Sequence, residues 1–404
     1  MKGNNTEKVK SDNRRSILST IYTHGPISRI EIAEKLSLTP PTITGHVSRL
    51  MAEGLIVETE SEIPLQTGLG RRRVAIDFNP GAAYLIGLDI SPIATYVCVS
   101  DLRGNIMAEK RMIRVPDDYD EAVGFMASLV RDIMKTAQVK KKLYRGIGIS
   151  VPGCVSEDGR SIVFTAHYNW KDKPLADDIS KLTEFPSVLL NDARARSITM
   201  ELFSDMDIPD VYTYVYASRG IASPSIVGAN DIVPRHVSPG ELGHMVMEPD
   251  GEVCPVCGSR GCLQSYSSEN YIIRKIRERW LSGEPTILSE MEVDPDHLKI
   301  EDILEAQKKG DALCSDMITK AVKYLGTAIA NLIYVMTPSL VIIDSKMTES
   351  PENRALLEKS AWRSFYTSSS EKCRLEFIPW DDFRAAHGAA GHAIIEFIIL
   401  EKTV

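Results

Sequence analysis

The sequence predicts an α/β protein in two parts: a small head of three helices and a β-ribbon over residues 1–80, followed by a two-lobed α/β body. In the head, apolar residues recur at helical spacing in three short segments. In the body, compact apolar runs alternate with turns and helical segments, which is typical of strands connected by helices. A chain of 404 residues has room for two or three domains of ordinary size.

Composition and charge limit the class of protein. A hydrophobic content of 43% and a charged content of 25% exclude disordered, collagen-like and coiled-coil proteins. The sequence has neither an apolar stretch of about 20 residues nor an apolar N-terminal signal, so we expect a cytoplasmic protein with no membrane partner. The net charge is −8, yet residues 1–80 hold 11 Lys and Arg against 9 Asp and Glu. This basic head on an acidic body indicates that only the head contacts nucleic acid.

The head has the pattern of a helix-turn-helix with a wing. The spacing predicts helices over residues 13–22, over residues 29–36 and from residue 40, with Ser28 and Thr39 as the caps of the second and third. Two short apolar runs, at residues 55–57 and 74–76, predict the strands of the wing. The residues predicted to face DNA are Thr39, Thr42, Thr44, Gly45, His46 and Arg49 on the third helix, and Arg71, Arg72 and Arg73 on the wing.

An ordinary three-helix bundle followed by a solvated charged loop would give a similar pattern. The wing favours the DNA-binding interpretation, because consecutive arginines on a flexible tip suit a narrow, electronegative minor groove. Small polar residues on the outer face of the third helix, with Gly45 among them, leave room for DNA to approach the backbone.

The sequence of the body predicts a sheet with polar residues at the ends of its strands, where α/β proteins bind ligands. A polar segment that begins at Asn191 and Asp192 follows the last of its expected strands and runs into a helix. The expected strands cover residues 84–90, 95–100, 106–115, 144–150 and 187–190, with a helix over residues 119–138.

Four motifs give the body a resemblance to the ROK family of repressors, open reading frames and sugar kinases: GIGISVPG at 146–153, NDA at 191–193, GELGH at 240–244 and CGSRGCL at 257–263. The resemblance covers residues 80–400, and the head with its GRRR wing is similar to the repressor branch. It implies a ribonuclease-H-like, actin-like fold. The implied domains are the head (1–80), an N-terminal lobe (81–190) onto which a C-terminal helix (386–402) packs, and a C-terminal lobe (191–385). It also implies a homodimer or a dimer of dimers, because helix-turn-helix proteins pair half-sites.

His244, Cys254, Cys257 and Cys262 have the spacing H-x9-C-x2-C-x4-C, which predicts a closed structural zinc site. The family usually has one residue between the first two cysteines, whereas this chain has two. Two alternatives are reduced cysteines in a loop and a zinc ribbon that itself binds DNA, and the acidic residues around the motif disfavour the second. Four further cysteines, in or beside apolar runs, are expected in the core: Cys98, Cys154, Cys314 and Cys373.

The resemblance also implies an effector site for a sugar or sugar derivative. The implied ligands are Asn191, Asp192, Glu241 and His244, together with Gln264, His167 and Gly153. Gln264 and His167 stand where the family has Glu and Asn. Arg194 replaces a family Asn and either pairs with a neighbouring carboxylate or contacts a charged ligand. Asp192 would be the general base if the protein were a kinase.

Phosphoryl transfer requires backbone N–H groups that hold phosphate, and glycine-rich turns supply them in family kinases. Here Pro92, which has no N–H, lies in the first of the three segments. The second, at residues 218–222, keeps one glycine, and the third, at 344–346, begins with an aspartate. We therefore expect a sugar-responsive DNA-binding transcriptional regulator with a degenerate ATP site. The alternatives are a sugar kinase fused to a DNA-binding domain and a constitutive repressor with a vestigial pocket.

Overall fold

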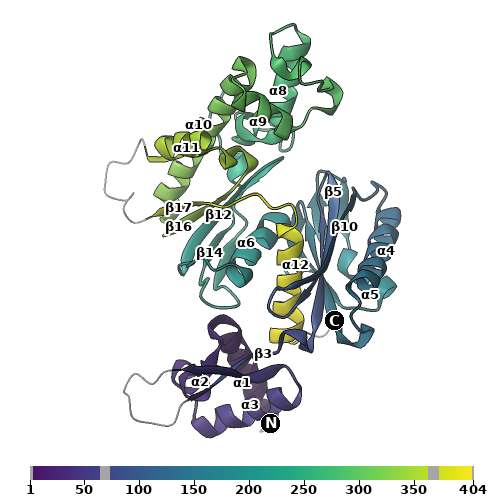
Figure 1. Cartoon of the computed structure of the whole chain (residues 1–404), viewed down its shortest axis with the longest axis vertical. Helices are drawn as coiled ribbons and strands as arrows, with labels where there is room; N and C mark the ends of the chain where they lie inside the picture. The colour runs from purple at the N-terminus through teal and green to yellow at the C-terminus, as the bar shows by residue number, and fades with distance from the viewer. Residues whose placement is uncertain (1–2, 64–72, 363–372, 403–404) are drawn as a thin grey trace. The chain divides into compact units, whose positions relative to one another are not determined.

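The computed structural model describes residues 3–63, 73–362 and 373–402 (Figure 1). The chain forms two compact units. The first comprises Met1–Met206, Asn230–Val233 and Asp382–Val404, and the second comprises Asp207–Ala229 and Pro234–Asp381. The expected domain boundaries at residues 80, 190 and 385 remain predictions, because compactness alone does not show which parts fold independently. No helix among the residues described is long and apolar enough to cross a membrane.

The head is a winged helix-turn-helix, as predicted. Its helices are α1 (Gly3–His24), α2 (Arg29–Leu36) and α3 (Pro40–Ala52), and its strands are β1 (Ile27–Ser28), β2 (Ile56–Ile63) and β3 (Arg73–Phe78). The strands form an antiparallel sheet in the order β1-β3-β2. The first helix begins ten residues earlier than predicted, because its N-terminal turns are polar and apolar periodicity cannot mark a solvated turn.

The two predicted caps differ in outcome. The capping box is confirmed: Ser28 Oγ accepts from the N–H of Glu31 at 3.3 Å, and the Glu31 carboxylate accepts from the N–H of Ser28 at 2.9 Å. Thr39 occupies the N-cap position of α3 but makes no cap bond, and its hydroxyl lies 2.9 Å from that of Thr42. Prolines occupy the first two helical positions, so one of the two N–H groups that a cap side chain binds is missing.

The body part of the first unit is a five-stranded sheet in the order β11-β7-β4-β5-β6. Its strands are β4 (Tyr84–Ile90), β5 (Ala94–Asp101), β6 (Ile106–Ile113), β7 (Tyr144–Val151) and β11 (Ser187–Asn191). The β11, β7 and β4 strands are parallel, and β5 and β6 are antiparallel additions. Helices α4 (Tyr119–Ala137) and α5 (Leu175–Thr183) lie on one side of the sheet, and α6 (Asp192–Phe203) and α12 (Arg384–Ile394) lie on the other (Figure 1). A small sheet of β8 (Cys154–Val155), β9 (Ile162–Thr165) and β10 (Trp170–Lys173) was not expected.

Two strand glycines set the distance between α12 and this sheet. A Cβ atom at Gly87 would lie 1.9 Å from the carbonyl oxygen of Ala386, and one at Gly148 would lie 1.8 Å from that of Ala389. No side chain fits there, so the helix backbone packs directly on β4 and β7. The second of these glycines belongs to the GIGISVPG motif, which therefore has a packing role independent of any ligand.

The head and the body sheet share one hydrophobic core. Buried residues of α1, α3 and β3 are continuous with residues of β4, β5, α12 and the π-helical turn Ile395–Ile399 that follows it. Arg103, in the turn between β5 and β6, also connects the body to the head through polar and aromatic contacts. It donates to the carbonyl of Tyr22 at 2.9 Å, pairs with Asp77, and lies over the rings of Tyr22 and Phe78, with its guanidinium carbon 5.1 and 5.6 Å from their centroids.

The second unit contains a mixed sheet in the order β15-β14-β12-β16-β17, with β13 paired to β12. Its strands are β12 (Val211–Ala217), β13 (Ile221–Ala222), β14 (Ser225–Val227), β15 (His236–Ser238), β16 (Leu340–Asp344) and β17 (Arg374–Phe377). Its helices are α7 (Gln264–Ser267), α8 (Glu269–Leu281), α9 (Ile300–Lys308), α10 (Ala312–Met336) and α11 (Pro351–Trp362). The long α10 supplies many of the buried side chains of this unit's core.

Replacement of Gly148 by Ala tests the packing of α12. The added methyl group has no space against Ala389, so we expect a loss of about 1–3 kcal/mol in the free energy of unfolding, measured by denaturant titration. Gly124→Ala is the matched control, because this glycine lies in α4 with no atom within 4 Å of its Cβ position. We expect the control to gain about 0.5–1 kcal/mol from helix propensity. Equal effects of the two substitutions would contradict the packing argument.

Candidate functional site

The third helix presents the predicted side chains outward. Thr39, Thr44, Gly45 and Arg49 are exposed and Thr42 and His46 are half-buried, whereas Ile43, Val47 and Leu50 on the opposite face have no exposed surface. No atom lies within 4 Å of a Cβ built on Gly45, so packing inside the head does not require glycine there. The open backbone at this position is available to a partner.

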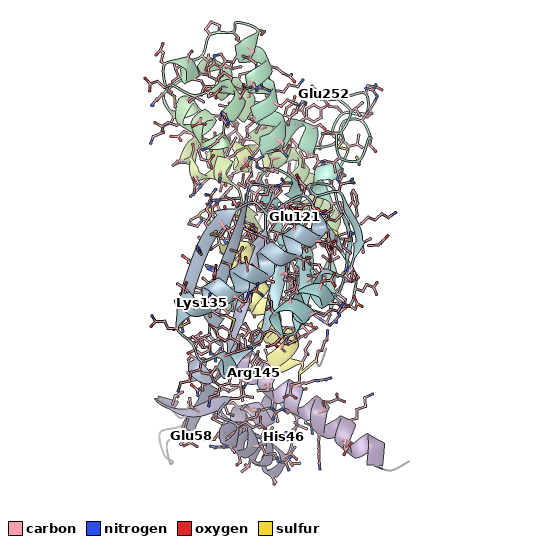
Figure 2. The ribbon with its side chains drawn as sticks, turned by 90° about the vertical axis from the view of Figure 1, so that its right-hand side faces the viewer. His46, Glu58, Glu121, Lys135, Arg145 and Glu252 are labelled. Atoms are coloured by element: carbon pink, nitrogen blue, oxygen red, sulfur yellow. The ribbon has the colours of Figure 1, made fainter. Side chains whose placement is uncertain are left out.

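Three positive side chains lie near His46 on α3. Figure 2 shows His46 at the surface of the head. Partial burial lowers the pKa of His46, and the neighbouring cations Arg49, Arg14 and Lys10 lower it further. Arg14 is ion-paired with Glu53 and Glu401, whereas the exposed Arg49 and Lys10 suit a face that meets phosphate groups.

Part of the wing lies outside the described residues, including Arg71 and Arg72. Arg73 is the first residue of β3, where its backbone is in register with Ile63 of β2. The assignment of these three arginines to DNA stays a prediction.

A second cluster contains the four predicted metal ligands. One nitrogen of His244 and the sulfurs of Cys254, Cys257 and Cys262 all lie within 4.8 Å of one another. The Nδ1 atom of His244 is 4.0 Å from the sulfur of Cys254, and the sulfurs of Cys257 and Cys262 are 3.6 Å apart. Three sulfurs and one imidazole at this spacing can hold one tetrahedral metal ion.

The loop is shaped by glycines and by hydrogen bonds to sulfur. Gly258 and Gly261 have φ values of 76° and 71°, and a Cβ at Gly261 would lie 1.6 Å from the carbonyl oxygen of Glu248. Burial alone would raise the pKa of Cys254, but hydrogen bonds from the backbone near Cys257 and from the Gln264 amide lower it to about 6. These donors favour the thiolate form that a metal requires.

The other cysteines follow the core expectation with one exception. Cys98, Cys314 and Cys373 are buried, but Cys154 is exposed. It begins the short β8 strand of the small sheet, a surface element that the apolar runs around it did not reveal.

The predicted effector residues divide between the two units. In the first unit, Asn191 ends β11 and caps α6. Its side-chain oxygen accepts from the N–H groups of Ala193 and Arg194 at 3.0 and 3.2 Å, and its amide donates to the carbonyl of Gly153 at 3.1 Å. The structure thus brings Asn191 and Gly153 together.

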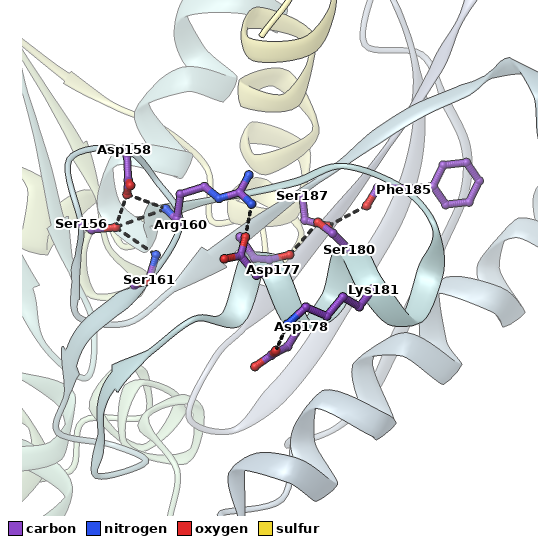
Figure 3. Close-up of polar contacts among 11 residues, drawn as sticks. Ser156, Asp158, Arg160, Ser161, Asp177, Asp178, Ser180, Lys181, Phe185 and Ser187 are labelled. Carbon is purple, nitrogen blue, oxygen red and sulfur yellow. Dashed lines mark hydrogen bonds and ion pairs between the residues drawn. The ribbon is translucent and has the colours of Figure 1, made fainter. Parts of the chain in front are cut away.

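A polar turn supports the strand that carries Asn191 (Figure 3). Ser156 Oγ accepts from the N–H of Ser161 at 2.9 Å and donates to Asp158 at 2.6 Å, and Arg160 pairs with Asp177 of α5. The carbonyl of Gly159, in the same turn, accepts from the N–H of Leu189 in β11 at 2.8 Å. The edge of β11 is therefore held on the side opposite to β7.

Asp192 lies beside Asp89, a buried acidic group that was not among the predicted site residues. It is half-buried at the start of α6, and burial raises its pKa. Asp89, at the end of β4, is 4% exposed and accepts from Ser150 Oγ at 2.6 Å. Burial raises the pKa of Asp89 to about 7, against the opposing effects of Ser150 and of the buried Arg196. The spacing of four residues between Asp192 and Arg196 on one helix is the signal that could have revealed this cluster.

The remaining residues of the prediction are placed as follows. In the second unit, Glu241 is exposed, His244 ends the short turn Leu242–His244, and Gln264 begins α7 and is 8% exposed. In the first unit, His167 is exposed in the turn between β9 and β10, and its carbonyl accepts from Arg114 at 3.3 Å. Arg194 forms a two-contact ion pair with Glu201 on its own helix, so the carboxylate alternative is confirmed.

The three segments that would hold phosphate in a kinase have these surroundings. Pro92 lies in the turn between β4 and β5. In the second segment, the N–H of Ser218 donates to the carbonyl of Gly220 at 3.0 Å and is no longer available to a ligand. In the third, Asp344 has no exposed surface and accepts from the hydroxyl of Tyr214.

Comparison with known proteins places both parts of the chain. Residues 85–395 match the ROK family, and residues 10–57 match the winged helix-turn-helix DNA-binding family. The xylose repressor of Bacillus subtilis is 29% identical over 352 residues, which cover 85% of this chain and 84% of the repressor. The DNA-binding transcriptional dual regulator NagC of Escherichia coli is 25% identical over 370 residues, 90% of this chain and 89% of the regulator.

Solved structures show the same fold. A ROK family transcriptional regulator, a homologue of the E. coli MLC protein, covers 97% of this chain and 98% of its own length, with a TM-score of 0.81 and 24% identity. A ROK family glucokinase from Streptomyces griseus, in complex with glucose and AMPPNP, covers 76% of this chain and 98% of its own length, with a TM-score of 0.66 and 22% identity.

The buried carboxyl of Asp89 gives a pH-dependent prediction. The pKa of Asp89 is about 7 in the folded protein, whereas that of an ordinary aspartate is 3.8. Ionisation of Asp89 therefore opposes folding as the pH rises from about 4 to about 7. Asp89→Asn keeps an acceptor for Ser150 and removes this effect. We expect the stability of the variant, relative to wild type, to be higher at pH 8 than at pH 5 in denaturant unfolding. A difference that does not change with pH would contradict the assignment.

Proposed function

Because the chain belongs to the ROK family and carries a winged helix-turn-helix DNA-binding domain, we propose that it is a sugar-responsive transcriptional repressor. Its partners are double-stranded operator DNA and a small sugar or sugar derivative. The observation that carries the proposal is the single hydrophobic core shared by the winged head and the body sheet. In this arrangement a ligand-dependent change in the body reaches the DNA-binding surface. The names of the relatives, a xylose repressor and NagC, agree with this proposal.

The proposed effector residues fall in two groups, one in each unit. Asn191, Asp192, Gly153 and His167 belong to the first unit, and Glu241, His244 and Gln264 belong to the second. Carboxylate and amide groups suit a polyol, because they accept from and donate to hydroxyl groups. Asp192, half-buried at the start of α6, is the acceptor that we propose as the main contact to a sugar hydroxyl.

The route from effector to DNA runs through one unit. Asn191 and Asp192 begin α6, and α6 packs on α12, where a Cβ at Gly388 would lie 1.7 Å from the carbonyl of Ala195. The end of α12 and the following π-helical turn supply core residues to the winged head. Effector binding that favours one arrangement of this unit thereby changes how two heads of a dimer fit two half-sites. By linkage, operator DNA changes the affinity for the effector to the same extent.

The metal proposal is a structural zinc ion held by His244, Cys254, Cys257 and Cys262. Three thiolates and one imidazole match the preference of zinc and leave no open position for catalysis. When bound, the ion would cross-link a loop that has little regular structure of its own. His244 also belongs to the GELGH segment, so the metal would fix one proposed effector residue.

The rival function is a sugar kinase fused to a DNA-binding domain, and one observation favours it: Asp192 is present where family kinases have their base. Three observations oppose it. A proline replaces a phosphate-binding N–H in the first segment, a local hydrogen bond uses an N–H in the second, and a buried aspartate stands in the third. We therefore propose that the protein has no kinase activity.

Arginines of the wing give a prediction for DNA binding. The double variant Arg71→Ala, Arg72→Ala should bind operator DNA more weakly. The slope of log K against log salt should fall by up to about 2, since each lost phosphate contact removes about 0.9. The matched control is Lys140→Ala, Lys142→Ala, which removes two exposed charges from the body. An equal fall in slope for the control, or an unchanged slope for the wing variant, would count against the assignment.

Asp192→Asn separates the sensor from the kinase. In a sensor, Asn turns one acceptor oxygen into a donor, so the operator complex should form normally but require about 10- to 100-fold more sugar to respond. Operator binding is measured by fluorescence anisotropy during sugar titration, with Asp132→Asn, at an exposed position of α4, as the charge-matched control. Formation of sugar phosphate from ATP by the wild type, lost in Asp192→Asn, would overturn the sensor proposal.

A further inference from the structure

Gln264, a proposed effector residue, also contacts one of the proposed metal ligands. Its side-chain Nε2 donates to the sulfur of Cys254 at 3.1 Å, and the contact is buried. Its Oε1 faces the GELGH segment, since a Cβ built on Gly243 would lie 3.1 Å from that oxygen. The amide therefore lies between a proposed metal ligand and the segment that carries another.

The chemistry of the contact requires an amide. A metal-bound thiolate carries negative charge and accepts hydrogen bonds, which an amide N–H can donate. The carboxylate of Glu, which has the same shape, has no proton to donate and would face the thiolate with like charge. Only the nitrogen end of Gln264 suits the sulfur, so the orientation of the amide follows from this contact.

The backbone around Gln264 is fixed by its neighbours. Its carbonyl accepts from Ser268 Oγ at 2.7 Å, and the hydroxyl of Ser267 in the same turn donates to the carbonyl of Ala321 in α10 at 2.8 Å. The side chain is 8% exposed. A buried amide on a turn anchored to the longest helix of its unit can hold a sulfur in one position.

We propose that Gln264 is a positioning residue of the metal site, which holds the thiolate of Cys254 through an N–H···S hydrogen bond and so slows release of the metal ion. The inference rests on the proposed metal site. It gives the glutamine a role that an effector contact alone would not require. Gln264 stands where the family has Glu, so this difference from the family would change how the loop holds its metal ion.

The test measures the rate of zinc release from the full-length protein. Protein purified without chelator is analysed for zinc, then mixed with excess 4-(2-pyridylazo)resorcinol, and the absorbance of the zinc complex is followed. Gln264→Glu and Gln264→Leu should each release zinc about 10- to 100-fold faster than wild type, because both lack the donor. Circular dichroism before mixing establishes that each variant is folded.

Ser265→Ala is the matched control. The serine is the next residue of α7, is 3% exposed, and its hydroxyl makes no hydrogen bond in the part of the chain that the structure describes. Its zinc release should equal that of wild type. Unchanged release in both Gln264 variants, with a change in sugar response only, would overturn the inference and assign Gln264 to the effector. A wild-type protein that holds no zinc would overturn the metal proposal itself, which is a different result.

Discussion

The packing of α12 on the body sheet is the constraint on which the rest of the first unit depends. Glycines on β4 and β7 let the helix backbone approach the strands, and Gly388 lets α6 approach the helix from its other side. Alanine and glycine make up most of α12, so short side chains dominate where the helix meets these layers. Since Asn191 caps α6 and Asp192 begins it, this three-layer contact sets the position of these two proposed effector residues.

The same helix reaches the winged head, and this makes the head part of the first unit. Apolar residues of the π-helical turn after α12 enter the core that also holds α1, α3 and β3. Arg103 adds contacts that depend on direction, because its guanidinium meets a helix carbonyl, a carboxylate and two aromatic faces at once. A repressor needs such a connection, since a sensor joined to its DNA reader only by a flexible linker has no means of changing the reader's orientation.

Local patterns were predictable from the sequence, and contacts between distant segments were not. The Ser28 capping box and the four-ligand spacing follow from residues close in sequence, and the structure places both sets together. The cluster of Asp89, Ser150 and Arg196 joins two strands and a helix, and its one local signal, the spacing of Asp192 and Arg196 on α6, does not reveal the two strands. Arg103 lies in an ordinary polar turn, and only the fold brings it to the head. The wrong placement of Cys154 in the core has a similar cause, because an apolar run does not reveal which sheet edge is exposed.

Motif residues that serve the fold must be separated from those that serve a ligand. Gly148 in the GIGISVPG motif has no room for a side chain because of α12, and Asn191 caps the helix that it begins. Both residues would be required whether or not the protein transfers a phosphoryl group. By contrast, Gly220 has no atom within 4 Å of its Cβ position, so packing does not require glycine there. A body can therefore keep motifs of its family through packing alone, whether or not it transfers a phosphoryl group.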